Sequence, residues 1–277
     1  MAQSGLILVT IIWGITFSLV KEALNDAPPF SFTTFRFGLA TILTLMIVNR
    51  KMFQITRSEL IGGIICGFFL YLGYAFQNFG LMITTASKSA FITSISVLIV
   101  PVLLVLFNIQ HVRWRIWIAV LLATVGMYMI ILPGGDGLNS GDILTFGCAL
   151  GFALHIIVQD NYIKKNVRIL PFFCIQSGFV TLFSLINANI VETQSVVWSG
   201  RLLEAILVTG ILATFAAFLI MIWAQKILNP SETAIIFAIE PVAATLFAIV
   251  YTGEILDLWG WIGGALVFLA IAYGESE

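Results

Sequence analysis

The chain has 277 residues, of which 60% are hydrophobic and only 10% are charged, and its net charge is −1. Soluble domains carry about 25% charged residues and could not bury this much apolar surface, so the composition excludes an ordinary water-soluble fold and predicts an integral membrane protein in a lipid bilayer. The near-neutral charge also excludes a basic surface for nucleic acid.

Ten apolar runs follow one another along the chain, each close to the length of about 20 residues that a helix needs to cross a bilayer. Unpaired backbone groups are not tolerated in lipid, so these runs predict helices rather than open strands. The first run lacks the basic start and cleavage site of a signal peptide, and we expect it to be retained. The predicted helices span 5–22, 31–49, 60–80, 86–108, 114–133, 141–160, 170–188, 202–225, 231–252 and 258–274.

Lysine and arginine residues predict the orientation, because cytoplasmic loops carry an excess of both. The side that holds both termini has nine of them and the other side has four, which together make the 13 in the composition. We therefore expect a multi-pass protein of the cell membrane or inner membrane, with cytoplasmic N- and C-termini.

The sequence contains an internal repeat. The segment "ASKSAFITSISVLIVPVLLVLF" in the fourth run matches "PSETAIIFAIEPVAATLF" in the ninth, although four more residues precede the proline in the first copy. We predict two five-helix halves, residues 1–133 and 141–277, joined by a linker at 134–140. Five is an odd number, so the second half enters from the opposite face. The predicted fold is an all-α membrane protein of ten helices in two inverted repeats.

These motifs resemble those of the drug/metabolite transporter superfamily, EamA type. The resemblance covers nearly the whole chain and rests on Trp13-Gly14, Phe35-Arg36 and the segments 84–107 and 230–254. It implies a ten-helix transporter of amino acids, nucleotide-linked or sugar-phosphate metabolites, quaternary amines or drugs. Most members of the superfamily export or exchange, and some are driven by protons. The residue before the ninth-helix proline is often aliphatic or Glu, so Glu240 fits the pattern.

Glu240 and His155 are the first candidates for substrate binding or coupling. An ionisable residue inside a membrane helix is a functional candidate by default. Glu240 can exchange a proton or pair with a cationic substrate, and the alternative is a structural bond to a neighbour, such as the carbonyl near Phe237 that Pro241 leaves unpaired. His155 can donate and accept a hydrogen bond at once, and the alternative is an interior histidine with no transport role.

Trp13, Tyr74, Asn78 and Lys88 complete the predicted substrate and coupling residues. Trp13 can line a cavity or stack on a cation, or it packs against its neighbours. Tyr74 and Asn78 place polar groups on an apolar helix, where they serve either a substrate or helix association. Lys88 and Arg36 lie near outer helix ends, where a basic side chain attracts an anion or extends to the interface, and Arg36 is the more structural of the two.

The predicted mechanism is alternating access around a midplane cavity between the inverted halves. Pro101 and Pro241 are the predicted hinges, because a proline bends the helix that contains it. We expect a secondary transporter that exports small metabolites, above all amino acids or related zwitterions and organic cations. Protons are the candidate coupling ion and a homodimer is the candidate assembly. A channel or facilitative uniporter is the alternative.

An enzyme is not expected. An intramembrane enzyme needs a converging nucleophile, base and stabiliser, or a set of metal ligands. The chain has two histidines, no carboxylate cluster, and three cysteines that lie in apolar runs without metal-ligand spacing. We therefore expect no catalytic residue, metal or cofactor. The sequence also lacks a G-x-x-x-x-G-K-[ST] run, which argues against an ATP-driven pump.

Overall fold

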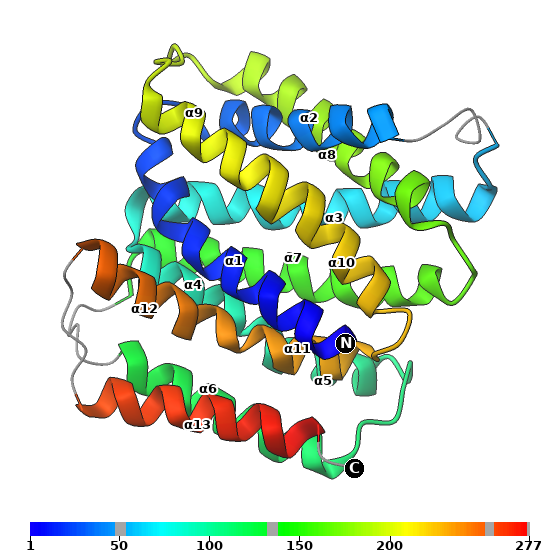
Figure 1. Cartoon of the computed structure of the whole chain (residues 1–277), viewed down its shortest axis with the longest axis vertical. Coiled ribbons are helices and arrows are strands. Elements are labelled where there is room, and N and C mark those ends of the chain that lie inside the picture. Colours follow the sequence, from blue (N-terminus) through cyan, green and yellow to red (C-terminus); the bar gives the residue numbers. More distant parts are fainter. Residues whose placement is uncertain (48–53, 132–137, 253–257, 276–277) are drawn as a thin grey trace.

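A computed structural model gives the structure of the chain and describes residues 1–47, 54–131, 138–252 and 258–275. All regular secondary structure in these ranges is helical. The helices run back and forth across one bundle, and α1 begins at the end of the bundle where α13 finishes (Figure 1). We call this the terminal end, and the other the distal end.

Ten rods make up the described bundle, some of them from more than one helix. The first five are α1 (Ala2–Ala23), α2 (Pro29–Ile47), α3 (Arg57–Ile83), α4 (Ala86–Ser94) with α5 (Ser96–Leu106), and α6 (Trp114–Ile131). The other five are α7 (Ser140–Ile163), α8 (Ile169–Val191), α9 (Gly200–Leu207) with η3 (Val208–Ala216) and α10 (Ala217–Ala224), α11 (Pro230–Phe237) with α12 (Ile239–Thr252), and α13 (Leu258–Glu275).

The prediction of an all-α membrane protein with ten helices is confirmed. In the described chain, eight rods are long and apolar enough to cross a membrane, and α6 and α13 contribute shorter apolar helices. The predicted linker at 134–140 lies largely outside the described residues, and α7 begins inside it, at Ser140.

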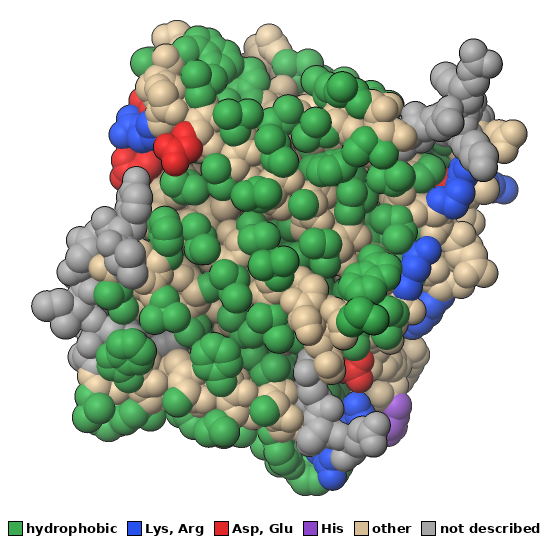
Figure 2. Space-filling view, in the orientation of Figure 1, with side chains coloured by type: hydrophobic (Ala, Val, Ile, Leu, Met, Phe, Trp, Pro, Cys, Tyr) green, Lys and Arg blue, Asp and Glu red, His purple; other side chains and the backbone are tan. Residues whose placement is uncertain are grey.

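The surface of the bundle is apolar between its two ends. Large side chains such as Leu121, Leu203 and Phe268 are exposed. Figure 2 shows apolar side chains over the middle of this face, with lysine and arginine gathered at the terminal end and a smaller mixed group of charges at the distal end. Exposed apolar area of this extent suits contact with lipid rather than water.

Three helices begin with a reciprocal capping box, in which the N-cap side chain and an acidic residue three positions later bond each other's backbone N–H. The pairs are Thr56 with Glu59 in α3, Asn139 with Asp142 in α7, and Asn229 with Glu232 in α11. These boxes satisfy donors that a helix start leaves open, and they fix where each rod enters the bundle.

The fourth and ninth rods are each broken once. The break lies at Ile95, ten residues after the N-cap Thr85, and at Ala238, nine residues after the N-cap Asn229. At each break the N–H bonds the carbonyl three residues back, at 3.1 Å and 3.0 Å respectively. The two breaks therefore occupy nearly equivalent places in the two matching segments.

The prolines do not occupy equivalent places. The prediction that Pro241 lies in the middle of a continuous helix is wrong, because the rod breaks at Ala238 and Pro241 lies in the first turn of α12. A proline in a first turn costs no hydrogen bond. Pro101 lies inside α5. The hinge role of both residues stays a prediction.

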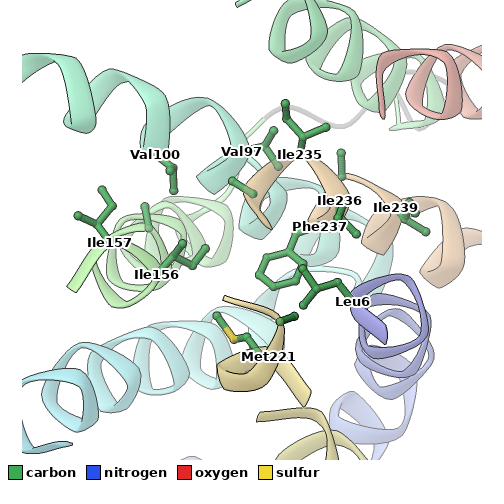
Figure 3. Packing of buried hydrophobic residues seen from close by; sticks show 14 of the residues in the cluster. Leu6, Val97, Val100, Ile156, Ile157, Met221, Ile235, Ile236, Phe237 and Ile239 are labelled. Atoms are coloured by element: carbon green, nitrogen blue, oxygen red, sulfur yellow. The ribbon is translucent and has the colours of Figure 1, made fainter. Parts of the chain in front are cut away.

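Aliphatic side chains pack tightly between the centre of the bundle and its terminal end. Figure 3 shows this packing, to which α1, α5, α7, α10 and α11 all contribute. It includes Leu6, Val97, Met221 and Ile236, each 1% exposed or less. On the distal side of this packing, the same helices surround a cavity.

Candidate functional site

A cavity lies at the centre of the bundle and is bounded by helices from both matching segments. Its walls are largely aromatic and aliphatic, with polar groups at a few places. The lining residues are Trp13, Thr16, Phe17, Val20, Arg36, Leu70, Tyr74, Gln77, Leu81, Thr93, Ser96, Phe152, His155, Ile156, Phe218, Met221, Phe237 and Glu240. Both broken rods reach it, because Thr93 and Ser96 flank one break and Phe237 and Glu240 flank the other.

Glu240 carries the acidic group of this cavity. It is the second residue of α12 and is 6% exposed. Among the described residues its carboxylate makes neither a hydrogen bond nor an ion pair, although it lines the cavity. The first turn of α12 favours a negative charge, because the N–H groups of a helix start point toward it. Within the described residues, the carboxylate is thus buried at the cavity without a hydrogen-bond or ion-pair partner.

Gly14 explains how α1 comes so close to this site. A Cβ added at Gly14 would lie 2.7 Å from the backbone oxygen of Glu240 and 2.7 Å from the Cβ of Ala243. Only a glycine permits this contact between the two helices. The adjacent Trp13 lines the same cavity as Glu240.

Trp13 links α1 to η3. Its indole N–H donates to the backbone oxygen of Ala213 at 2.8 Å. Its ring lies 5.3 Å from the ring of Phe218 and 5.2 Å from that of Phe237, centroid to centroid. Trp13 is thus held at both its polar and its apolar edges, as one wall of the cavity.

Arg36 lies in the cavity wall, so the expectation that it extends to the interface is wrong. It is 3% exposed, and its Nε donates to Thr214 Oγ1 at 2.6 Å. Its Nη2 donates to Tyr74 Oη at 3.0 Å and approaches the Ala213 oxygen at 3.4 Å. The guanidinium carbon also lies 4.5 Å from the centre of the Tyr74 ring. All of these partners are neutral.

His155 begins a chain of buried side chains that bind one another. Its Nε2 bonds Gln176 Oε1 at 3.0 Å, and Gln176 Nε2 donates to Gln159 Oε1 at 3.1 Å. Gln159 Nε2 then donates to Gln225 Oε1 at 2.6 Å. These hydrogen bonds join α7, α8 and the end of α10 on the terminal side of the cavity. His155 and Glu240 line the same cavity, but no hydrogen bond joins them.

Two predicted residues lie outside the lining. Asn78 donates from Nδ2 to Thr33 Oγ1 at 2.9 Å and so joins α3 to α2, while its Oδ1 is buried without a partner. Lys88 is partly exposed in the first turn of α4, where its backbone N–H bonds the cap residue Thr85. Of the six predicted substrate and coupling residues, the structure thus brings together Trp13, Tyr74, His155 and Glu240.

The burial of Arg36 in the cavity wall and the bonds of Gln159 and Gln176 were not predicted from the sequence. The signal for Gln159 and Gln176 was present, since each is an amide in an otherwise apolar run. Polar groups buried in membrane helices need partners, which here they find in each other. Nothing in the local sequence shows that their helices are neighbours.

The sequence profile of the EamA-like transporter family matches residues 1–132 and 139–273. The chain belongs to the EamA-like transporter family. An Archaeoglobus fulgidus protein named "Uncharacterized transporter" is 35% identical over 271 residues, which are 98% of this chain and 84% of that protein. The Rickettsia prowazekii "S-adenosylmethionine uptake transporter" is 21% identical, and the match covers 94% of this chain and 91% of that protein.

The fold of this family member also matches a solved structure. A protein crystal structure that is 17% identical in sequence superposes with a TM-score of 0.80, covering 99% of this chain and 97% of the other. At this identity the match concerns the fold alone. The family and the apolar helices together establish an integral, multi-pass membrane transporter.

Proposed function

We propose that this transporter is a secondary carrier of small zwitterions and organic cations, amino-acid-like molecules above all. The observation that carries the proposal is Glu240, a buried carboxylate at the central cavity that has no hydrogen-bond or ion-pair partner among the described residues. Such a carboxylate gains a favourable interaction only when it binds a cation or a proton. Ionisable groups that face a cavity inside a membrane bundle typically mark the path of a substrate or ion.

The walls beside Glu240 suit a cationic group as well. Trp13, Phe218 and Phe237 form one aromatic cluster, and Phe152 and Tyr74 form another, with ring centres 5.2 Å apart. Aromatic faces attract cations through the negative charge density above the ring, and the attraction grows when water is excluded. A carboxylate among aromatic rings is therefore complementary to an ammonium or a sulfonium.

Relatives support this class of substrate. Two matching proteins, from Rickettsia prowazekii and Rickettsia bellii, are named as uptake transporters of S-adenosylmethionine. That molecule carries a sulfonium, an ammonium and a carboxylate. It therefore combines the charges that the cavity of this chain is suited to receive, and it is a natural first probe.

Alternating access between residues 1–133 and 141–277 is the mechanism we propose. In the described conformation the aliphatic packing of Figure 3 lies on the terminal side of the cavity, while the cavity lining continues distally to Val20 and Leu81. Discontinuous helices that meet at a midplane cavity are typical of carriers built from inverted repeats. The rods α4–α5 and α11–α12 are broken at this cavity and are the elements we expect to move, together with α3 and α9–α10.

We place the terminal end in the cytoplasm. Described lysines and arginines gather there, as Figure 2 shows for one face, and cytoplasmic ends of membrane proteins carry this excess. Arg50 and Lys51, two of the nine basic residues that the sequence assigns to this side, lie outside the described residues. We propose net export with proton coupling through Glu240. Because a carrier cycle is reversible, the imposed gradients set the direction of measured flux.

Flux into proteoliposomes tests the proposal. Labelled S-adenosylmethionine and leucine are each supplied with and without a pH gradient, to wild type, Glu240→Gln and the control Glu204→Gln, which changes an exposed carboxylate on α9. We expect saturable flux, counterflow with unlabelled probe, and loss of both in Glu240→Gln alone. Flux that does not saturate would indicate a channel instead. If the pH gradient leaves the flux of wild type unchanged, proton coupling is wrong.

A further inference from the structure

We propose that Arg36 binds the carboxylate of the substrate, so that the cavity recognises molecules with a cationic end at Glu240 and an anionic end at Arg36. The proposal rests on the function proposed above and adds the recognition of the second charge. It assigns a direct binding role to a residue that the sequence marks as the more structural of two candidate cations.

The first step is that Arg36 has no counter-ion in the described protein. Its three hydrogen-bond partners are a threonine hydroxyl, a tyrosine hydroxyl and a backbone carbonyl. None of them carries a negative charge. Burying an unpaired charge is costly, and buried charges in proteins are ordinarily paired. A ligand carboxylate in the cavity would supply the pairing that the protein does not.

The second step is that Arg36 keeps donors available. Its described hydrogen bonds use Nε and Nη2, and none of them uses Nη1. Arg36 is among the residues that line the cavity. The two N–H groups of Nη1 are left to donate a charge-assisted hydrogen bond to a carboxylate oxygen. The bonds to Thr214 and Tyr74 hold the plane in place, so that little entropy is lost when a ligand binds.

The third step is the position of the opposite charge. Arg36 and Glu240 line the same cavity from α2 and α12, yet the described structure contains no ion pair between them. Two opposite charges that share a cavity without pairing offer a bound ligand one positive and one negative group. A zwitterion satisfies both charges, whereas a simple amine satisfies one.

The alternative is that Arg36 only anchors η3, through Thr214 and Ala213. An anchor would affect every ligand of the cavity to the same extent, since it acts through the wall. A binding group would affect only those ligands that carry a carboxylate. The two roles therefore differ in ligand selectivity rather than in overall activity.

The experiment compares S-adenosylmethionine with its decarboxylated analogue, and leucine with 3-methylbutylamine. Binding of each probe is measured on purified wild type, Arg36→Gln, Arg36→Lys and the control Arg57→Gln, which changes an exposed arginine at the start of α3. In wild type we expect each acid to bind about tenfold or more tightly than its amine, the usual scale for a bond between charged groups. Arg36→Gln should remove this preference, while its affinity for the amines stays within about twofold of the wild-type value. Arg36→Lys should restore part of the preference for the acids.

Two results would overturn the assignment. One is an equal loss for acid and amine in Arg36→Gln, which would make Arg36 an anchor of η3. The other is a wild type that binds acid and amine equally, which decides the question even if the Arg36 variants do not fold. Both leave the proposed transport of cations intact. If wild type binds and moves no probe of either pair, the proposed function fails, and this inference fails with it.

Discussion

Trp13 in α1 and Ala213 in η3 are joined by a 2.8 Å hydrogen bond from the indole N–H to the backbone oxygen, and Arg36 in α2 approaches the same oxygen at 3.4 Å. Two donors from the first helices of the chain thus converge on one carbonyl of a π-helical segment in the eighth rod. Nine-residue π-helices are rare, and shorter ones often occur at functional sites. These donors are a physical reason why this one persists beside the cavity.

Replacing Trp13 with Phe should separate the polar role of this residue from its packing role. Phenylalanine keeps ring contacts with Phe218 and Phe237 but loses the indole N–H. We expect the free energy of unfolding to fall by about 1 kcal/mol, the usual net value of such a bond, and probe affinity to fall as η3 loosens. Thermal unfolding in detergent measures the first effect. Trp261→Phe is the control, because that side chain is 57% exposed on α13. Equal stability of both variants would show that the bond to Ala213 contributes nothing.

Gly14→Ala should push α1 away from α12. The new Cβ would stand 2.7 Å from the Glu240 oxygen, which is too close for any carbon atom to remain. We expect destabilisation by about 1–3 kcal/mol, the usual range for overpacking, together with weaker binding of a cationic probe at Glu240. Gly178→Ala in α8 is the matched control, since its Cβ would lie 3.9 Å from its nearest neighbour, Thr41. Unchanged stability of Gly14→Ala would mean that the two helices are not tightly packed.

Local sequence was sufficient to predict the helices and to single out the acidic residue that lines the cavity. Ten apolar runs near the length of a membrane span leave lipid as the only solvent that suits them, and the described rods follow the predicted order. Glu240 was visible because a carboxylate in such a run breaks the local pattern. Trp13, Tyr74 and His155 were found by the same reasoning, as residues of unusual type within an apolar helix.

Which helices face each other could not be predicted from one sequence. Arg36 was expected either to attract an anion or to extend to the interface, as a basic residue near a helix end, and only the placement of α2 against η3 reveals its burial beside Thr214. The bonds among Gln159, Gln176 and Gln225 likewise connect three rods. The break at Ala238 depends on packing as well, since Pro241 alone would allow a kink in a continuous helix.

Asp26, in the distal loop between α1 and α2, should make stability depend on pH. Hydrogen bonds from Arg201 and Ser199 hold the pKa of its carboxyl below the ordinary value. A lowered pKa in the folded state means that the stabilisation is complete above the pKa of the unfolded chain, about 3.9. It is lost as pH falls through the lower folded value.

The measurement is the unfolding temperature of wild type and Asp26→Asn in detergent between pH 3 and pH 7. The wild type should be the more stable of the two at pH 7, and the difference should shrink below about pH 4, where the carboxyl begins to bind protons in the unfolded chain. The unfolding temperature of Arg201→Gln, like that of Asp26→Asn, should fall less than that of the wild type when the pH is lowered. A difference that stays constant across this range would rule out the contribution of the charged carboxyl.

Gln176→Leu should interrupt the chain of amides on the terminal side of the cavity. It leaves His155 Nε2 and Gln159 Oε1 without their present partner, and each buried polar atom without a partner costs about 1–3 kcal/mol. We expect a large fall in unfolding temperature. Asn187→Leu, on the same helix, is the control because Asn187 is partly exposed and its described hydrogen bond stays within its own helix. If both variants unfold at the wild-type temperature, the hydrogen bonds among these amide side chains do not stabilise this end of the bundle.

Replacing Pro101 and Pro241 together with alanine tests the predicted hinges. An alanine at 241 provides an N–H that can bond the carbonyl of Phe237, which would carry α11 across the break at Ala238 into α12 and stiffen the rod. Because such a rod resists bending, we expect turnover to fall several-fold while equilibrium binding of S-adenosylmethionine stays within about twofold. Pro171→Ala is the matched control, since Pro171 has the same first-turn position in α8, which continues unbroken from Ile169 to Val191. Wild-type turnover in the double variant would show that the rods do not bend at these residues, and a loss of binding as large as the loss of turnover would show that the prolines shape the site rather than its motion.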